Sequence, residues 1–526
     1  MTATVPAGPS HIYTSGQPDP VVPDRTLPDF LLAAARMRAD RPALIDGPTG
    51  RTLSYRQLAD GVQRVAAGLA ECGLGRGDVL ALMAPNSPEW LLGCYGTMAA
   101  GGVVTGVNPL YTPREVATQL AQTGARFLVT APPFLDTARA AIAESGNRCE
   151  IILLGPETAG CIPFARLLAP GAPPPAVDVG ASDLALLPCS SGTSGLPKSV
   201  LLTHRACVAN VLQQRYAVPY SEQDRVLAVA PFFHATGFFV VANGVLYDGG
   251  TVVTMPRFDL EQMLEMIQTY RITATVVVPP IVLALAKHPA VDRYDLSSLR
   301  WLACGAAPLG AALQQACARR LGCPVLQGYG MTELTAGIAI WSVGLPVRPG
   351  AAGRLLPGVQ ARVIDPVTGA DLPPGSTGEI WWRSPSAMAG YLGDPEATAE
   401  ALGADGWVHS GDIGRIDPDG ALWVVDRLKE LIKVKGFQVA PAELEAVLRT
   451  HPDIREAAVV AMPDERAGER PKAFVVRTGE LTAEDVLAWV ADRVAPHKRL
   501  GAVEFIDAVP TSPSGKTLRR LLRVRR

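Results

Sequence analysis

Short apolar runs alternate with segments of helical spacing through most of the chain, and this alternation limits the possible fold more than any other feature of the sequence. Residues 79–83, 127–130, 251–254 and 301–304 are short runs of the kind that form buried strands. Residues 27–38, 55–70 and 89–100 repeat apolar side chains with the period of a helix, and a further helix is expected from Gly237. Strands that alternate with helices form parallel sheets covered on both faces. We therefore expect an α/β fold with parallel-rich sheets.

The character of the sequence changes twice towards its C-terminal end. Residues 350–425 hold short β-type runs separated by Gly-Pro turns, which indicates an antiparallel β-lobe appended to the main sheets. The last hundred residues show two helices between short strands, the pattern of a small α+β domain. A chain of 526 residues also exceeds one ordinary core. The predicted domains are residues 1–428 and residues 429–526.

A loop rich in glycines and hydroxyl side chains lies between two apolar runs, at 184–188 and 200–202. Glycine backbone N–H groups, hydroxyl donors and a mobile ammonium are suited to phosphate oxygens. The residues concerned are Ser190, Ser191, Gly192, Thr193, Ser194, Gly195 and Lys198. An ordinary Ser/Gly surface loop is the alternative. A Walker-type loop is disfavoured, because Pro197 has no N–H to offer just before the lysine.

Further groups suited to a nucleotide follow this loop. Residues 327–333 combine an aromatic ring, glycines that permit close approach, a hydroxyl and a carboxylate, and Asp412 follows a glycine in a position suited to a ribose diol. Cationic side chains come next, at Arg427, Lys429, Lys433, Lys435 and Lys516. Taken alone, the lysines are typical of a solvated basic face, and His234 between apolar neighbours is typical of a core histidine.

Composition argues against several partners and locations. A net charge of −2 gives no electrostatic reason to expect nucleic acid. The longest apolar stretch, residues 274–286, is shorter than a membrane span and is interrupted by two prolines. Nine cysteines without a C-x-x-C pair suit reduced thiols. Since the N-terminal residues show no signal-peptide pattern, we expect a cytoplasmic protein without stable membrane association.

Together these motifs resemble the adenylate-forming enzymes, a superfamily that contains acyl-CoA synthetases, firefly luciferase and the adenylation domains of peptide synthetases. The resemblance is closest to 4-coumarate:CoA ligases and related acid–CoA ligases. It covers nearly the whole chain, from His11-Ile12-Tyr13 to Lys516, with six motifs in the order of the family. Ser194 stands where threonine is commoner, and Ser199 and Ser384 stand where glycine is usual. These changes remove no group that the reaction needs.

The resemblance implies a role for each matching residue. The ATP phosphates would lie on residues 190–198 and near Thr332, with Mg²⁺ on Glu333. Adenine would contact Ala306, Gln327, Gly328 and Tyr329, and the ribose would contact Asp412 and Arg427. Lys429 matches the hinge, Lys433 a position near the acyl-adenylate, and Lys516 the lysine required for adenylation. Coenzyme A would meet Arg257, Lys435 and Gly436.

The implied reaction has two steps. The carboxylate of a small acid attacks the α-phosphorus of ATP, which gives an acyl-AMP and pyrophosphate, and the thiol of coenzyme A then displaces AMP. The charge of Lys516, with Mg²⁺ on Glu333, would offset the meeting of two anions in the first step. Lys435 and Gly436 would serve the second step, so a small mobile C-terminal domain that rotates at Lys429 is expected.

Two alternatives to an acid–CoA ligase remain open on the sequence. One is an adenylating enzyme that passes the acyl group to a carrier protein or to oxygen. The other is a catalytically dead nucleotide-binding protein, against which the intact lysines and Glu333 argue. Peptide-synthetase domains carry a different motif at the position of His234, which in the resembling ligases lines the carboxylate end of the acyl pocket. His234 therefore favours an acid without an α-amine.

The acyl pocket is expected to be roomy and apolar. The matching positions are Thr236, Val240, Ala303, Ala306, Gly330 and Gly337, of which four are glycine or alanine. That leaves space for an aryl-propenoate of the cinnamate or 4-coumarate type or for a medium-chain fatty acid. Because Ala303 and Val240 offer no partner to a ring hydroxyl, we expect cinnamate or a medium-chain acid to be used at least as well as caffeate.

Overall fold

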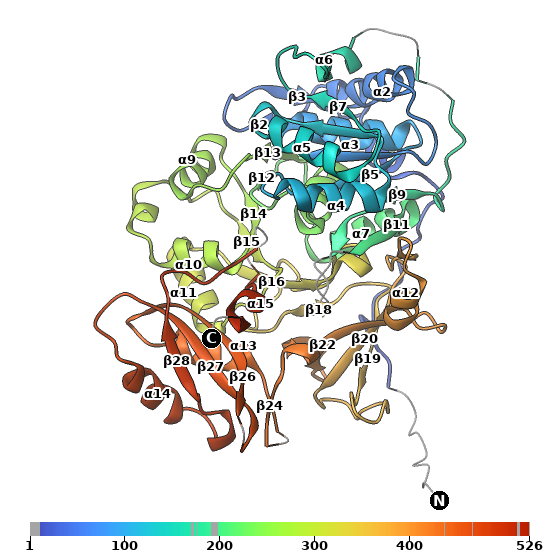
Figure 1. Ribbon diagram of the computed structural model, residues 1–526. Coiled ribbons are helices and arrows are strands. Elements are labelled where there is room, and N and C mark those ends of the chain that lie inside the picture. The colour runs from blue at the N-terminus through green and yellow to red at the C-terminus, as the bar shows by residue number, and fades with distance from the viewer. Residues whose placement is uncertain are drawn as a thin grey trace, which may run out of the picture.

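The computed structural model describes residues 11–169, 173–174, 176–190, 198–435, 437–464, 466–512 and 516–524. In this part of the chain, two large sheets form the N-terminal domain and a five-stranded sheet forms the smaller C-terminal domain, which is orange to red in Figure 1. The predicted α/β architecture with a small α+β domain is confirmed.

A nine-stranded sheet carries the parallel units expected from the first part of the sequence. Its strands run in the order β10 (Cys189–Ser190), β11 (Lys198–Thr203), β9 (Leu184–Leu186), β5 (Val103–Gly106), β4 (Val79–Met83), β6 (Phe127–Thr130), β7 (Glu150–Leu153) and β8 (Ile162–Pro163), and β21 (Gly390–Tyr391) pairs with β11. Its accompanying helices are α2 (Tyr55–Glu71), α3 (Pro88–Ala99), α4 (Pro113–Thr123), α5 (Leu135–Ser145) and α6 (Phe164–Leu167).

Alternate residues of β4 explain why both faces of this sheet are covered. Leu80 and Leu82 belong to the core that contains α2 and α3, whereas Val79, Ala81 and Met83 belong to the core beneath α4 and α5. Successive side chains of a strand point to opposite faces, so a continuously apolar strand must be buried on both.

A fourteen-stranded sheet combines a parallel part with an antiparallel part. Its order is β1 (Tyr13–Thr14), β19 (Gln360–Ile364), β20 (Gly378–Arg383), β22 (Val408–Ile416), β23 (Ala421–Arg427), β18 (Gly353–Leu355), β17 (Gly337–Ile340), β16 (Val325–Gly330), β15 (Trp301–Cys304), β14 (Ala274–Val277), β12 (Arg225–Ala228), β13 (Thr251–Thr254), β2 (Pro42–Asp46) and β3 (Thr52–Ser54). The β-rich lobe is thus present, but it continues the main sheet through the β16–β17 pair instead of packing as a separate layer.

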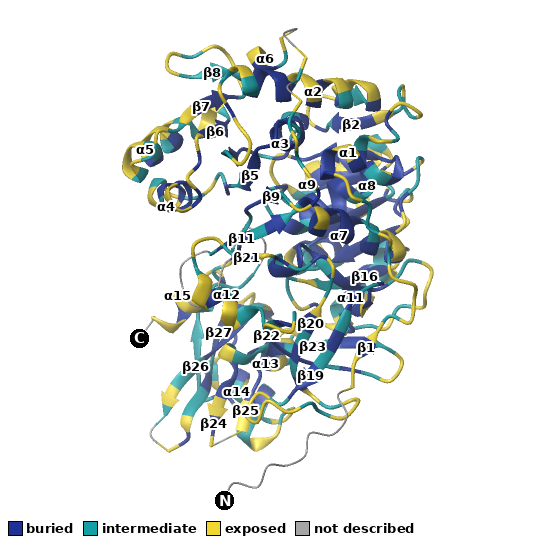
Figure 2. Ribbon diagram, turned by 90° about the vertical axis from the view of Figure 1, so that its right-hand side faces the viewer, coloured by how far each residue is buried: buried dark blue, intermediate teal, exposed yellow. Residues whose placement is uncertain are grey.

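Helices of the second half of the N-terminal domain connect and cover these strands. They are α7 (His204–Ala217), α8 (Gly244–Asp248), α9 (Leu260–Tyr270), α10 (Pro279–Lys287), α11 (Ala311–Leu321) and α12 (Pro395–Ala401). Figure 2 shows α7 buried along most of its length between the two large sheets. Within the described segments, no helix has both the length and the apolar character needed to cross a membrane.

The C-terminal domain has its own sheet and its own hydrophobic core. Its strands are β24 (Ile432–Val434), β25 (Phe437–Val439), β26 (Ile454–Asp464), β27 (Gly468–Arg477) and β28 (Ala502–Phe505), with helices α13 (Pro441–Leu448), α14 (Ala483–Ala491) and α15 (Arg519–Arg523). The two longer helices were expected, and the short α15 was not.

Two helices predicted from periodicity differ from the structure. A helix over residues 27–38 was expected, but α1 (Leu27–Leu32) is shorter, and the chain continues in i→i+3 turns. Tertiary contacts explain the change, because the guanidinium of Arg38 donates to the carbonyl of Tyr247 at 2.9 Å. The helix expected from Gly237 is instead π-helical over Thr236–Asn243. A Cβ at Gly237 would lie 2.2 Å from the carbonyl oxygen of Pro231, so this turn needs a glycine.

Candidate active site

One wall of the site is built at the carboxyl ends of the neighbouring parallel strands β15 and β16. After β15 the chain turns through Ala306, whose φ of 68° is a strained left-handed conformation for a residue with a side chain. A Cβ on Gly305 would lie 3.4 Å from the carbonyl oxygen of Gly328, so the two strand ends approach closely. The expected adenine contacts, Ala306 and Gln327–Tyr329, therefore lie together.

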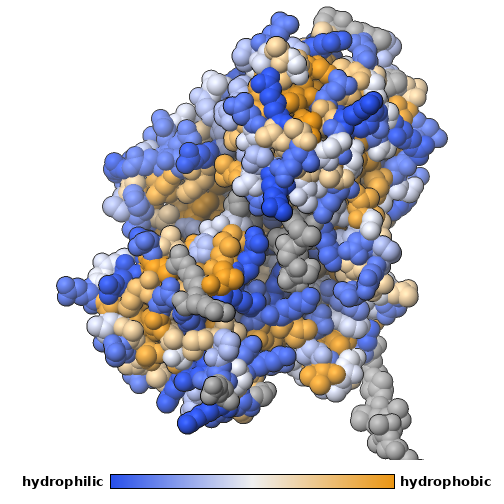
Figure 3. All heavy atoms as spheres, viewed as in Figure 1, coloured by the Kyte–Doolittle hydropathy of each residue, from blue (hydrophilic) through white to orange (hydrophobic). Residues whose placement is uncertain are grey.

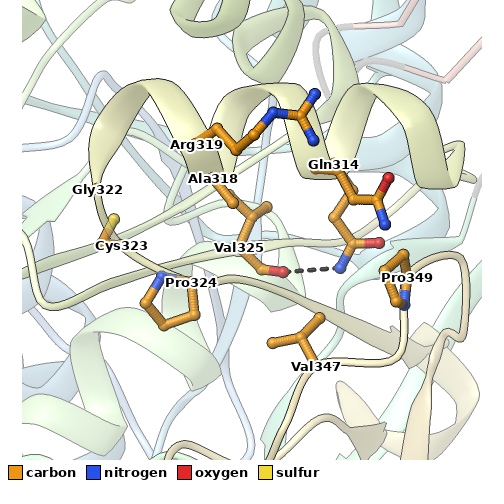
Figure 4. A pocket seen from close by; sticks show the side chains of 10 residues that line it. Gln314, Ala318, Arg319, Gly322, Cys323, Pro324, Val325, Val347 and Pro349 are labelled. Atoms are coloured by element: carbon orange, nitrogen blue, oxygen red, sulfur yellow. Dashed lines mark hydrogen bonds between the residues drawn. The ribbon is translucent and has the colours of Figure 1, made fainter.

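Gln327 is held from behind this wall by Gln314 of α11. Its Nε2 donates to Oε1 of Gln314 at 2.8 Å and to the carbonyl oxygen of Leu309 at 3.2 Å. Gln314 also lines an open cavity of about 490 Å³ and donates through Nε2 to the carbonyl oxygen of Val325 at 2.7 Å (Figure 4). This cavity adjoins the support of the wall and contains none of the residues expected to bind ATP or the acid.

A buried carboxylate links the wall to the antiparallel strands. The phenol of Tyr329 donates to Oδ2 of Asp412 at 2.6 Å, and Nε of Arg427 donates to Oδ1 at 3.1 Å. Asp412 and Arg427 are directly opposite each other on β22 and β23. Burial raises the pKa of Asp412, and the neighbouring guanidinium opposes that shift. Both oxygens of Asp412 are thus engaged by donors that keep its charge paired.

Glu333 lies on the short 3₁₀ turn Thr332–Leu334 directly after this wall. The turn ends in a strained residue, because Thr335 has a φ of 71°, and its hydroxyl donates to the carbonyl of Ser386 at 2.7 Å. The amide of Met388 donates to the backbone carbonyl of Glu333 at 2.8 Å. Segment 386–388 therefore fixes the turn that presents both Thr332 and Glu333.

The Glu333 carboxylate suits Mg²⁺ that also contacts phosphate oxygens. It is only 9% exposed, and its Oε1 accepts a hydrogen bond from the phenol of Tyr391 at 2.9 Å. Burial and then the Glu333 charge raise the pKa of Tyr391, so the phenol stays a donor at neutral pH. Among the described residues, no three histidine, cysteine, aspartate or glutamate side chains gather as a metal site. Magnesium commonly takes one or two carboxylates and completes its shell with phosphates and water.

Lys516 reaches this site from the C-terminal domain. Burial, and next the charge of Arg427, lower the pKa of its ammonium, while Asp412 and Glu333 act in the opposite sense. Lys516 also contributes to lowering the pKa of His234. The structure therefore brings together the expected adenylation lysine, the ribose carboxylate, the magnesium carboxylate and the acyl-pocket histidine. Figure 3 shows the surface hollowed where the upper and lower parts of the molecule meet.

His234 is neutral in this environment. Burial and the Lys516 charge lower its pKa to about 4. Its Nδ1 accepts a hydrogen bond from the amide of Thr236 at 3.3 Å, so the neutral ring carries its proton on Nε2. The histidine can therefore donate one hydrogen bond without adding a positive charge beside the lysine.

The phosphate loop is described at its two ends. Ser190 is buried at one end, and at the other Nζ of Lys198 lies 3.7 Å from Oδ2 of Asp394 and 5.1 Å from the centre of the Tyr391 ring. Other expected contacts, at Ser191, Gly192, Thr193, Ser194, Gly195 and Gly436, lie outside the described residues.

The residues expected to contact coenzyme A, and the lysines expected at the hinge and near the acyl-adenylate, are not gathered at the centre of the site. Arg257 is exposed beyond the end of β13, and Lys429, Lys433 and Lys435 are exposed around the start of the C-terminal domain. The backbone of Lys433 donates to Glu469 at 2.7 Å, and Lys435 has a φ of 49°. The structure thus presents Lys516 to the site, and Lys435, the lysine expected to meet coenzyme A, to solvent.

Two buried amides on α7 were missed by sequence reasoning. Nδ2 of Asn210 donates to the carbonyl oxygen of Gly337 at 3.0 Å, and Asn210 accepts a hydrogen bond from Nε2 of Gln214. A Cβ on Gly337 would lie 3.9 Å from Cδ of Gln214, whose buried Oε1 has no hydrogen-bond partner among the described residues. The sequence signal was present, since amides three or four residues apart occupy one buried helix.

Comparison with known proteins identifies the class that this fold and site define. The model of the AMP-binding enzyme family matches residues 31–392, and that of the AMP-binding enzyme C-terminal domain matches residues 443–516. Solved relatives include ATP-bound MatB from Rhodopseudomonas palustris, which is 31% identical with a TM-score of 0.86 over 95% of this chain and 98% of that one. The anthranilate CoA ligase AuaEII in complex with anthranoyl-AMP is 27% identical with a TM-score of 0.88, over 95% and 97% of the two chains. The chain belongs to the AMP-binding, adenylate-forming enzyme family.

Curated relatives narrow the position within the family. 4-Coumarate–CoA ligase 1 of Petroselinum crispum is 41% identical over 98% of this chain and 96% of its own length. 4-Coumarate–CoA ligase 3 of Oryza sativa subsp. japonica is 40% identical over 98% of this chain and 95% of its own length. The expected resemblance is confirmed. The chain is an ATP-dependent, AMP-forming acid–CoA ligase close to this group, and the family uses ATP, Mg²⁺ and coenzyme A.

Proposed function

We propose that the acid is an aryl-propenoate of the 4-coumarate type. The observation that carries the proposal is the buried Oε1 of Gln214, which has no hydrogen-bond partner among the described residues. Gln214 lies next to Gly337, at the end of the acyl pocket that was expected from the sequence to be apolar. A para-hydroxyl on a bound ring would donate to this oxygen. Curated relatives named 4-coumarate–CoA ligases support the same acid.

The buried amide distinguishes this acid from the other candidates. Cinnamate and octanoate would leave Oε1 of Gln214 without a partner, and an unsatisfied buried acceptor costs about 1–3 kcal/mol. Caffeate would satisfy it with one hydroxyl but must desolvate the second. We therefore expect 4-coumarate to be used best, with cinnamate used at least as well as caffeate.

The site residues receive these roles in the first step. His234, neutral and protonated on Nε2, donates to the acid carboxylate. Asp412 and Arg427 bind the ribose, and Ala306 and Tyr329 contact the adenine. Glu333 would hold Mg²⁺, which supplies positive charge to the ATP phosphates when bound. Lys516 stabilises the charge that moves onto the leaving pyrophosphate.

The second step requires the C-terminal domain to move. We place its boundary at residues 428 and 429, between the last strand of the fourteen-stranded sheet and β24. Support comes from Lys516 at the site and Lys435 in solvent, because both belong to one domain and each is needed in one step. Lys429 is the proposed pivot. We also propose a cytoplasmic location, where coenzyme A and ATP are available.

Competition assays with Gln214→Leu test the acid. In the unmodified enzyme we expect kcat/KM for 4-coumarate to exceed that for cinnamate about tenfold, because one buried hydrogen bond contributes roughly that factor. In the variant we expect this preference to disappear. Gln213→Leu is the matched control, because Gln213 also has a buried Oε1 without a partner among the described residues, but its Nε2 donates to the carbonyl of Pro357 and the hydroxyl of Ser384 rather than to Asn210. An unchanged preference in Gln214→Leu, or a tenfold preference for caffeate over cinnamate, would contradict the pocket assignment.

A further inference from the structure

Tyr391 lies between the two charged side chains that the family assigns to the ATP phosphates and their metal ion. Its phenol donates to Oε1 of Glu333 at 2.9 Å. The ammonium of Lys198 lies over its ring, 5.1 Å from the ring centre. Lys198 also pairs with Asp394, with 3.7 Å between Nζ and Oδ2. One short segment, residues 390–394, therefore contacts both the carboxylate expected to hold Mg²⁺ and the lysine expected to bind the phosphates.

This segment is fixed against the strand that leaves the phosphate loop. β21 pairs antiparallel with β11, with Tyr391 opposite Val200, and the amide of Leu392 donates to the carbonyl of Ser199 at 2.9 Å. On the other side, the amide of Tyr391 donates to the hydroxyl of Thr398 in α12 at 2.9 Å. The phenol consequently has a defined position relative to the end of the phosphate loop.

Glu333 needs such a partner because its backbone alone does not fix its carboxylate. The amide of Met388 holds the main-chain carbonyl of Glu333, whereas the side chain still has freedom of rotation. A neutral donor on one oxygen selects one rotamer and leaves the second oxygen and the full charge for a metal ion. Outer hydrogen bonds of this kind orient metal-binding carboxylates in general.

We propose that Tyr391 is a positioning residue for the magnesium carboxylate. Its hydroxyl fixes the rotamer of Glu333 before the nucleotide binds, and its ring keeps Lys198 beside the same phosphates. The hydroxyl and the ring of Tyr391 therefore have different roles. The hydroxyl affects the ATP binding that depends on Mg²⁺, and the ring affects the ATP binding that does not. This role does not depend on which acid the enzyme uses.

Calorimetric titration of the full-length protein with ATP, in Mg²⁺ and in excess EDTA, tests the proposal without turnover. For Tyr391→Phe we expect binding of ATP in Mg²⁺ to weaken about tenfold, the usual worth of a hydrogen bond to a charged group, while binding in EDTA changes less than twofold. Tyr391→Leu also removes the ring, so we expect an additional loss of severalfold in EDTA.

Two further variants make the result specific. Tyr270→Phe removes a hydroxyl that donates to the carbonyl of Gly47 at 2.7 Å, and it should leave both titrations unchanged. In a Glu333→Gln background, Tyr391→Phe should add almost nothing, because the two residues act through one contact. Equal weakening with and without Mg²⁺ in Tyr391→Phe would overturn the proposal. So would an undiminished effect of Tyr391→Phe in the Glu333→Gln background.

Discussion

The nucleotide side of the site and the lysine that completes it are held in contrasting ways. Asp412 and Arg427 sit on adjacent strands of one continuous sheet, and Tyr329 joins them through a hydrogen bond of 2.6 Å. Lys516 belongs to another domain with a separate core, and its carbonyl accepts a hydrogen bond from the amide of Ser512 at 2.7 Å. The first group is fixed to the large sheet, while the second is carried by a domain that has its own sheet and hydrophobic core.

This difference allows one site to serve two reactions. AMP is part of the product of the first step and the leaving group of the second, so the groups that bind it are needed throughout. Charge beside pyrophosphate is needed only in the first step. A fixed AMP-binding cradle, formed by Asp412, Arg427 and Tyr329, and a lysine that can move away together meet both needs. Variants of the two regions should therefore differ in which half-reaction they affect.

Lys516→Ala is expected to give the largest effect. Acyl-AMP formation should fall ~10²–10³-fold, since a charged contact to the transition state is lost. Thioester formation from supplied acyl-AMP should be largely retained, because the role proposed for the lysine is confined to the first step. Single-turnover measurement of each half-reaction checks this outcome, and an equal loss in both would show that Lys516 belongs to the fixed cradle.

Asp426, on β23 of the large sheet, contacts the C-terminal domain, and its protonation is expected to make the stability of the folded protein depend on pH. Its carboxylate accepts the amide of Ala442 at 2.8 Å, at the start of α13. Burial raises its pKa to about 6, so the folded protein retains a proton that the unfolded chain, with an ordinary pKa of 3.8, releases earlier. This contribution to stability is complete below pH 4 and is lost as the pH rises through 6.

Asp426→Asn tests that expectation because the amide cannot ionise and can still accept the hydrogen bond. Between pH 4 and pH 7 the unmodified protein should lose roughly 2 kcal/mol of stability relative to the variant. Urea unfolding of both proteins across this range measures the difference. Parallel profiles would mean that Asp426 titrates in the folded protein as it does in the unfolded chain.

Tyr329→Phe tests the fixed cradle and is expected to give the smallest effect of these variants. The ring stays, but Asp412 loses one donor, so we expect about a tenfold loss. Both half-reactions should slow by similar factors, because AMP is bound in each. A loss confined to acyl-AMP formation would remove the distinction between the two regions.

Local pattern was sufficient to predict much of the fold. The strands at 127–130, 251–254 and 301–304 agree with β6, β13 and β15 to the residue, because a short apolar run between turns has few other solutions. Residues 33–38 and the π-helix at 236–243 departed from their periodicity. In the first case the contact of Arg38 with Tyr247 is made across 209 residues, and such contacts are invisible to a local pattern.

Some residues of the site could likewise be predicted from the sequence, whereas others could not. Motifs that concentrate chemical groups, such as residues 327–333, revealed the positions around Glu333 and Tyr329. Gln214 and Tyr391 were missed because each acts through a residue far along the chain, and Tyr391 and Glu333 are 58 positions apart. The sequence shows that such side chains are polar or aromatic, whereas their partners are known only once the sheets are assembled.

Amine footprinting of Lys516 and Lys435, read by mass spectrometry, tests the movable lysine most directly. With ATP and Mg²⁺, Lys516 should be protected and Lys435 reactive, because in this structure Lys516 is partly buried at the site whereas Lys435 is exposed. With acyl-AMP and coenzyme A, the pattern should reverse, because the C-terminal domain then presents its other face to the same cradle. Protection of Lys516 and reactivity of Lys435 that stay the same in both states would contradict a domain that carries the two lysines in turn.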